Sequence, residues 1–249
     1  MRALILAAMI SVAAAPAMAV PADVKASVAA TSERSEVNVK LDPLRKPAEL
    51  LNWLGLQKGS RVADMFGGNL YWAEIFAPAI GPKGRVTIWQ PQQFYNQKTY
   101  DRLTAFTAKQ PNVFMRVSPF EAPNLPANTY DFMLINLDYH DVYWESAERK
   151  IPRMDPDAWL KTIYASLKPG ATLGVVDHIA VPGDTRATVE KLHRIDPNVV
   201  KADFKRAGFV LVGESQVLRN PADDHSLNVF DEKIRGKTDR FVFKFRKPR

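Results

Sequence analysis

The chain has 249 residues, of which 46% are hydrophobic and 24% are charged, and its formal net charge is +7. These values are typical of one sizeable globular domain. The absence of cysteine excludes disulfides, thiolate metal sites and cysteine nucleophiles. The positive charge would favour peripheral contact with an anionic envelope surface or nucleic acid. No motif interleaves aromatic with basic residues, so solubility is the simpler explanation and no nucleic-acid partner is expected.

Residues 1–19 have the pattern of a secretory signal peptide. Arg2 is followed by an apolar stretch over 3–15, which is too short to span a bilayer as a mature helix. The small residues at 17–19 form an A-x-A cleavage site. We therefore expect export to the periplasm or beyond, with a mature chain starting at Val20; an uncleaved anchor is the alternative.

The next segment, 20–41, has no clear periodicity, and we expect a flexible arm there. A helix is expected to start at Asp42-Pro43 or near Pro47, and from that point strands and helices alternate. Strands are expected at 61–66, 85–90, 112–117, 130–137, 171–179, 209–218 and 240–247, and helices at 71–80, 95–110, 155–167 and 196–208. This alternation predicts a single doubly wound α/β domain over 42–249, Rossmann-like, with a mainly parallel sheet. The last two strands have no helix between them and should pair antiparallel.

The first strand runs into a glycine turn and then a helix, in the stretch VADMFGGNLYW over 62–72. Asp64, Gly67 and Gly68 therefore lie at the carboxyl end of a parallel strand, where such sheets bind ligands. Glycine lets the backbone approach a ligand closely, and the following helix offers free N–H groups. The alternative is a tight turn that binds nothing.

The order of several motifs resembles that of class I S-adenosylmethionine-dependent methyltransferases, from about 47 to 247. The motifs are LGLQKGSRVADMFGG, GPKGRV, EAPNLPANTYDFMLI and LKPGATLGVVDH. More narrowly, a GGxYW-like turn, YHD, VDH, LHRID and GKTDRFVFKFRKP resemble a set of exported, uncharacterised predicted methyltransferases. The resemblance implies a seven-stranded sheet whose antiparallel last strand lies between the fifth and sixth. It also implies S-adenosylmethionine as cofactor, in a pocket over the first three strands, and a small-molecule or envelope acceptor.

Carried over by position, the resemblance implies a set of cofactor-binding residues. They are Asp64, Gly67, Gly68, Gln90, Glu121 and Asn136, with Glu121 opposite the adenine amine and 136–138 beside the transferred methyl. Two departures stand out. Phe66 and Leu70 occupy positions where the family has glycine, and Gln90 stands where an acidic residue binds the ribose hydroxyls. Glutamine lacks the charge for that paired bond.

A second group of polar residues follows the fourth and fifth strands. His140 and His178 come directly after these strands, and His193 lies just beyond. Carboxylates accompany them: Asp138, Asp141, Asp177 and Asp196. The pattern suits a general base oriented by a carboxylate, or two or three ligands of a metal. We expect His140 as the base, Asp138 or Asp177 as its orienting group and His178 nearby. The alternative is that Asp177 and His178 only cap local turns.

The segment 219–239, between the last two strands, is longer than a hairpin requires. We expect it to emerge on the ligand side of the sheet as a lid that brings His225, Arg235 or Lys237 over the pocket. The alternative is a surface loop without a functional role. Three functions remain open. They are an exported methyltransferase, a periplasmic binding protein with a reassigned pocket, and a metal-dependent hydrolase built on the histidines.

Overall fold

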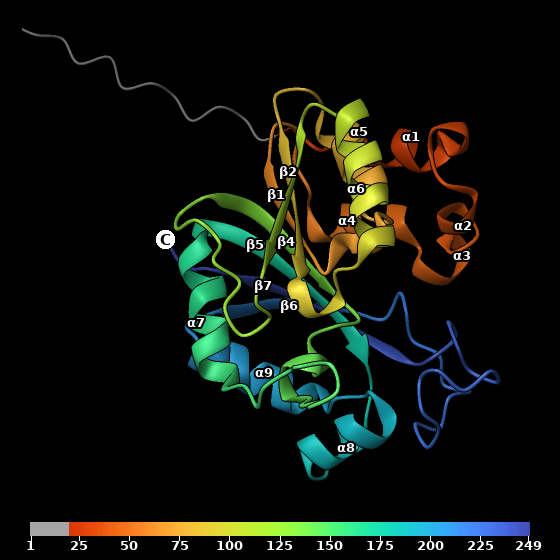
Figure 1. Cartoon of the computed structure of the whole chain (residues 1–249), viewed down its shortest axis with the longest axis vertical. Coiled ribbons are helices and arrows are strands. Elements are labelled where there is room, and N and C mark those ends of the chain that lie inside the picture. Colours follow the sequence, from red (N-terminus) through yellow and green to blue (C-terminus); the bar gives the residue numbers. More distant parts are fainter. Residues whose placement is uncertain (1–19) are drawn as a thin grey trace, which may run out of the picture.

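The computed structural model describes residues 20–249, so the expected signal peptide lies outside the described residues. Seven strands form one sheet in the order β3-β2-β1-β4-β5-β7-β6 (Figure 1). They are β1 (Arg61–Met65), β2 (Arg85–Pro91), β3 (Val113–Ser118), β4 (Tyr130–Asn136), β5 (Leu167–His178), β6 (Val210–Ser215) and β7 (Arg240–Arg246). β7 is antiparallel to β5 and β6, and all other neighbouring strands are parallel. This confirms the predicted fold class.

Helices cover both faces of the sheet (Figure 1). One layer holds α4 (Pro47–Leu54), α5 (Ala73–Ile80) and α6 (Gln97–Lys109), and the other holds α7 (Pro156–Ser166) and α9 (Pro197–Arg206). Successive strand residues point to opposite faces. Val62 and Leu134 therefore join the first layer's core, whereas Ala63 and Met133 join the second. Because both faces are covered, the strand ends and their loops remain to form a binding site.

The segment 20–41, expected as a flexible arm, is instead folded onto the domain. It contains α1 (Val24–Ala29) and α2 (Glu36–Val39), and α3 (Asp42–Arg45) follows. Val24 is buried, and α1 contacts α4 and α5. Asp23 and Ser35 cap the two short helices with their side chains. Helices of one or two turns are too short to show a 3.6-residue period, which explains why the sequence pattern missed them.

Two further differences concern the second half of the chain. The sequence pattern missed α8 (Thr185–Leu192), whose N-terminus is capped by Asp184. β5 begins at Leu167, four residues earlier than predicted. Its register with β4 shifts between Tyr130 and Phe132, and Gly170, within this first part of β5, has a φ of 82°. Glycine adopts this left-handed conformation without strain.

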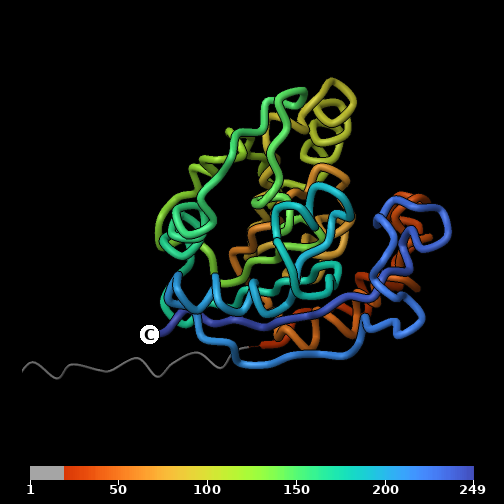
Figure 2. Tube along the Cα trace, turned by 90° about the horizontal axis from the view of Figure 1, so that it is seen from below, coloured from red at the N-terminus to blue at the C-terminus, as the bar shows by residue number. Residues whose placement is uncertain are grey.

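The long segment 219–239 returns beside the N-terminal helices (Figure 2). The Arg240 guanidinium at its end donates a 3.1 Å hydrogen bond to the carbonyl of Leu44 in α3. Across residues 20–249, no helix combines the length and the apolar character that crossing a membrane requires.

Candidate functional site

The turn after β1 has a left-handed backbone at the two positions where the sequence lacks glycine. φ is 60° at Phe66 and 67° at Leu70, on either side of the short 3₁₀ helix Gly67–Asn69. Side chains with a Cβ adopt this conformation at a cost of about 1 kcal/mol or more each. The backbone is therefore left-handed at both positions although neither residue is glycine.

Gly67 and Gly68 are required by close packing beneath this turn. A Cβ on Gly67 would lie 2.5 Å from Asp64 Oδ2, and one on Gly68 would overlap Gln90 Oε1. The Gly68 N–H donates to that same oxygen at 2.9 Å. Gln90 thus holds the turn with its oxygen, while its side-chain N–H groups remain available to a ligand.

Asp64 is a buried carboxylate without a hydrogen-bonding partner. The residue is 1% exposed, and neither of its side-chain oxygens receives a hydrogen bond. Burial raises the pKa of Asp64 to about 8, although the positive charge of Arg45 acts in the opposite direction. An unpaired buried carboxylate is costly. A cationic ligand above the turn would relieve this cost, which fits the amine-bearing cofactor that the resemblance implies.

A hollow of about 300 Å³ opens beside the turn. Its lining residues are Phe66, Gly68, Asn69, Gln90, Phe94, Thr99, Arg102, Asp138 and Asp141. Arg102 donates a 3.1 Å hydrogen bond to the carbonyl of Gly68 and so braces the turn from α6. Of the predicted cofactor residues, Gly68 and Gln90 line this hollow. Asp64 and Gly67 are not among its lining residues, although Gly67 is next to Gly68 in the turn and packs on Asp64.

Glu121 and Asn136 are not brought into this hollow. Glu121 is exposed and accepts a 3.0 Å hydrogen bond from the side-chain amide of Gln93. Asn136 is buried at the end of β4 and is not among the lining residues. The Phe66 ring, which packs edge-on to Phe120 at 5.3 Å, borders this part of the site.

The predicted histidine pair lies at the carboxyl ends of β4 and β5: His140 follows β4, and His178 is the last residue of β5. His140 is 4% exposed, and its Nδ1 lies 2.8 Å from Asp177 Oδ1. Its backbone N–H donates to Asp177 Oδ2 at 2.9 Å. Asp177 rather than Asp138 therefore orients the imidazole. Burial lowers the pKa of His140, but the charges of Asp177 and Asp141 outweigh it, and the pKa lies well above its usual value.

His178 lies close to His140, as expected for residues after adjacent strands, with ring centroids 5.9 Å apart. Its Nδ1 is 2.6 Å from Thr238 Oγ1. Burial and the charge of His140 lower the pKa of His178 well below its usual value. The Asp138 side chain takes no part in these hydrogen bonds. Burial and the charge of Asp141 raise the pKa of Asp138.

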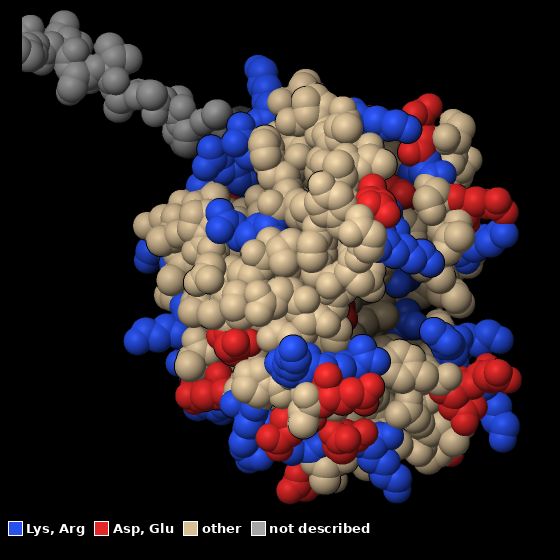
Figure 3. Space-filling view, in the orientation of Figure 1, with Lys and Arg blue, Asp and Glu red and all other residues tan. Residues whose placement is uncertain are grey.

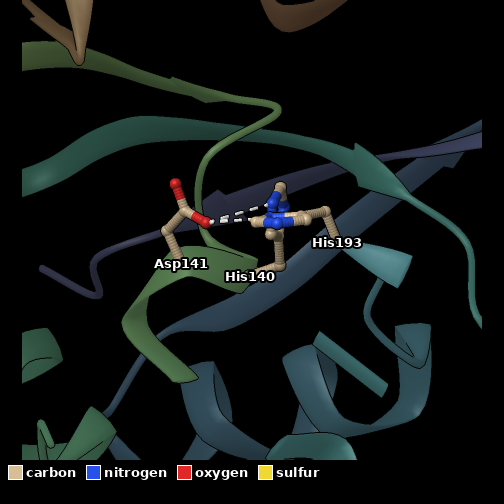
Figure 4. Close-up of side chains that lie close together, drawn as sticks. All are labelled: His140, Asp141 and His193. Atoms are coloured by element: carbon tan, nitrogen blue, oxygen red, sulfur yellow. Dashed lines mark ion pairs between the residues drawn. The ribbon is translucent and has the colours of Figure 1, made fainter. Parts of the chain in front are cut away.

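Asp141 and His193 join the site, although neither is in the predicted catalytic set. Asp141 Oδ1 lies 3.2 Å from His140 Nε2 and 3.6 Å from His193 Nδ1 (Figure 4). The sequence signals were present, since Asp141 follows His140 directly and His193 belongs to the LHRID motif. The sequence pattern did not reveal α8, whose C-terminal end positions His193.

A larger hollow of about 860 Å³ lies over the histidines. Its lining includes His140, His178 and His193, and it shares Asp138 and Asp141 with the smaller hollow at the glycine turn. Figure 3 shows this face of the molecule hollowed between the half that holds α6 and the half that holds α8. Two ligands bound in the two hollows would meet at the shared carboxylates.

The segment 219–239 reaches the larger hollow through residues other than those predicted. Val229 and Phe230 line it, whereas His225, Arg235 and Lys237 are not among its lining residues. His225 Nε2 instead lies 3.1 Å from Asp239 Oδ2. The polar residues of the segment thus hold its fold, and its apolar residues border the site.

No protein-family model matches the chain. Among curated proteins it is similar to the ubiquinone/menaquinone biosynthesis C-methyltransferase UbiE of Hydrogenovibrio crunogenus, with 29% identity over 123 residues. The match covers 49% of this chain and 44% of that protein. The matched part therefore spans less than half the length of the relative.

Solved structures resemble the chain over most of its length. An S-adenosylmethionine-dependent methyltransferase of Aquifex aeolicus gives a TM-score of 0.55 at 19% identity, covering 84% of this chain and 98% of that one. The 1,6-didemethyltoxoflavin-N1-methyltransferase of Burkholderia thailandensis, with S-adenosylhomocysteine bound, gives 0.56 at 14%, covering 91% and 86%. The [4+2]-cyclase SpnF gives 0.56 at 15%, covering 82% of each. At these identities the likeness establishes the fold.

Proposed function

We propose that this chain, which has the fold of class I S-adenosylmethionine-dependent methyltransferases, transfers a methyl group from S-adenosylmethionine to a small-molecule acceptor. The observation that carries the proposal is the turn at Asp64, Gly67 and Gly68, with its unpaired carboxylate and its adjoining hollow. The similarity to UbiE supports the proposal, because that relative is named as a C-methyltransferase. The [4+2]-cyclase SpnF has a similar structure, so the fold alone does not determine the reaction.

The proposed cofactor site is formed by residues that suit the two ends of the cofactor. Gly67 and Gly68 allow close approach of the backbone, and Gln90 offers amide donors to a ribose. Asp64 supplies negative charge to the cationic methionine end. For Glu121 to bind an adenine amine, it would have to exchange its present bond to Gln93. Asn136 would act from the end of β4.

S-adenosylmethionine, when bound, supplies an already activated methyl group, so the protein has mainly to align the acceptor and remove its proton. We assign that proton to His140 Nε2, because Nδ1 is engaged with Asp177. Since the pKa of His140 is raised, the neutral ring that accepts the proton is present only at alkaline pH, and turnover should rise with pH. The Asp177 carboxylate stabilises the resulting imidazolium. Asp138 lines both hollows, and His178 lines the larger one, where the acceptor would bind.

Calorimetric titration with S-adenosylmethionine and S-adenosylhomocysteine tests the proposal directly. Binding at tens of micromolar or tighter, about −6 kcal/mol or better, supports it, and the absence of binding to either compound rejects it. Gly68→Ala should weaken the affinity at least tenfold, because its Cβ would overlap Gln90 Oε1. Gly183→Ala is the matched control, since the nearest atom to that Cβ is 3.9 Å away, and it should bind like the unchanged protein.

Export is a further part of the proposal, supported by the signal-like sequence of residues 1–19. Expression of the full chain, followed by fractionation and N-terminal sequencing, tests it. A periplasmic product that starts at Val20 is the expected result. A cytoplasmic product that retains Arg2 would oppose export without affecting the proposed reaction.

A further inference from the structure

Three side chains converge at the base of the larger hollow in a way that a general base alone does not require. The donor atoms of His140, Asp141 and His193 all lie within 4.8 Å of one another (Figure 4). They come from two distant parts of the chain, the 3₁₀ helix His140–Tyr143 after β4 and the C-terminal end of α8. All three residues line the hollow, so an ion held there would be accessible to a small molecule.

Two of the three separations between these donors are close to those around a metal ion. Ligands at 2.0–2.1 Å from a tetrahedral ion lie about 3.4 Å apart. The two separations from Asp141 Oδ1 are 3.2 Å, to His140 Nε2, and 3.6 Å, to His193 Nδ1. Small side-chain movements would bring both separations to this value.

Asp141 Oδ1 is also buried, and although both rings lie close to it, neither forms a hydrogen bond of good geometry with it. A buried carboxylate oxygen close to two imidazoles would ordinarily be paired by one of their N–H groups. The poor alignment of these contacts is compatible with three donors arranged around a common point. A cation at that point would satisfy the oxygen and both ring nitrogens together.

The surroundings provide the outer contacts that metal-bound histidines usually have. Asp177, which is 0% exposed, lies 2.8 Å from His140 Nδ1 and leaves Nε2 as the free ligand atom. A carboxylate–histidine–metal arrangement of this kind fixes the tautomer and the direction of the ring. With Asp141, this places two carboxylates beside the His140 ring.

His193 has an unusual backbone for its position. It ends α8 with φ 51° and ψ 47°, a left-handed conformation in which glycine or asparagine is preferred. Trp144 and Phe230 border its ring, with centroids 5.3 Å and 5.1 Å away. Histidine adopts this conformation more readily than most side chains, and the two aromatic rings restrict the position of its imidazole.

We propose that His140, Asp141 and His193 bind one divalent transition-metal ion of the zinc class. Two imidazoles and one carboxylate suit zinc and its neighbours better than magnesium or calcium, which prefer oxygen ligands. The fourth position faces the hollow. Its consequence for catalysis rests on the proposed methyl transfer: in the metal-loaded protein His140 Nε2 would be a ligand rather than the base. The ion would lower the pKa of an acceptor hydroxyl bound at the fourth position, and that proton would pass to water in the hollow.

Metal binding can be measured without the cofactor, so this proposal and the proposed methyl transfer can fail separately. Purified full chain without a histidine tag is dialysed against Zn²⁺, and bound zinc is measured by elemental analysis. We expect one equivalent at micromolar affinity or tighter. His193→Asn and Asp141→Asn should each weaken binding at least tenfold. Asparagine suits the left-handed backbone at 193, so that variant should remain folded.

His225→Asn is the matched control, because His225 also has a positive φ of 66° and lies 3.1 Å from a carboxylate, that of Asp239. It should bind zinc like the unchanged protein. Cobalt(II) gives a second readout, since a tetrahedral absorption spectrum is expected for the unchanged chain and should be lost in His193→Asn. Zinc affinity that is equal in the unchanged protein and in His193→Asn would overturn the proposal. An octahedral cobalt spectrum shared by all variants would do the same.

Discussion

At the scale of single residues, Asp64 is the group whose environment departs most clearly from its ordinary one. Its side chain is buried and unpaired. Burial raises its pKa, and the nearby positive charge of Arg45 only partly offsets this effect. The sequence identified Asp64 because it ends a strand before a glycine turn, a local pattern. It could not reveal that the carboxylate lacks a partner, because this depends on side chains from several elements.

Asp64→Asn should stabilise the protein increasingly as the pH rises. The folded pKa of about 8 lies above the unfolded value of about 3.9. Below pH 4 both states are protonated, so Asp64 contributes no difference. Between pH 4 and 8 the unfolded state releases a proton that the folded state keeps, so unfolding becomes easier as the pH increases. Thermal unfolding at pH 5 and pH 9 should show the variant gaining at least about 2 kcal/mol relative to the unchanged protein. Parallel stability curves for the two proteins would contradict the assignment.

His140→Gln should reduce methyl transfer far more than cofactor binding. Loss of a general base lowers turnover by about 10²- to 10⁴-fold, whereas His140 is not among the residues that line the smaller hollow. The affinity for S-adenosylhomocysteine should therefore change by less than about threefold, or less than 0.7 kcal/mol. Steady-state turnover and calorimetry provide the two values. His225→Gln is the control, and similar losses of turnover and affinity in His140→Gln would assign it a structural role instead.

At the scale of elements, the strands and long helices could be predicted because their periods of 2 and 3.6 residues appear in the local sequence. The segment 20–41 could not, because its helices are one or two turns long and are stabilised by burial against α4 and α5. α8 was missed for a related reason: within its eight residues only Val189 is buried, so it shows no apolar stripe. His193 was consequently left without a position relative to His140.

The Arg194–Asp223 pair fixes the segment 219–239 over the site. Arg194 is fully buried and forms two hydrogen bonds to Asp223, of 2.9 Å and 3.0 Å. Breaking one partner of a buried pair is strongly destabilising, by about 3–5 kcal/mol, because the remaining charge stays unpaired. Asp223→Ala should therefore lower the melting temperature and make 219–239 sensitive to proteases.

Glu145→Gln provides the comparison for that experiment, because it breaks the exposed pair with Arg153, at 3.1 Å. Exposed pairs contribute about 0–1 kcal/mol, so this variant should melt and digest like the unchanged protein. If Asp223→Ala behaved the same way, Val229 and Phe230 would be held over the hollow by packing rather than by the buried pair.

At the scale of the whole molecule, the fold brings two hollows together at one edge of the sheet. The order β3-β2-β1-β4-β5 places the glycine turn after β1 beside the histidine after β4. Asp138 and Asp141 border both hollows. The charged side chains on the face drawn in Figure 3 are of both signs and are interspersed, which agrees with a small-molecule site rather than a single broad charged surface.

Ligand-induced shifts in melting temperature can show whether the two hollows bind independently. A ligand that binds only the folded protein stabilises it by about 2.7 kcal/mol at one hundred times its dissociation constant. For a domain of this size that corresponds to a rise in melting temperature of roughly 5–10 °C. S-adenosylhomocysteine should produce such a shift in the unchanged protein and in His193→Asn, because His193 does not line the smaller hollow. Zinc should produce a shift only where His193 is present. Loss of both shifts in His193→Asn would mean that the two hollows are coupled through this residue, whereas independent shifts would identify a donor site and a metal site that share one edge of the sheet.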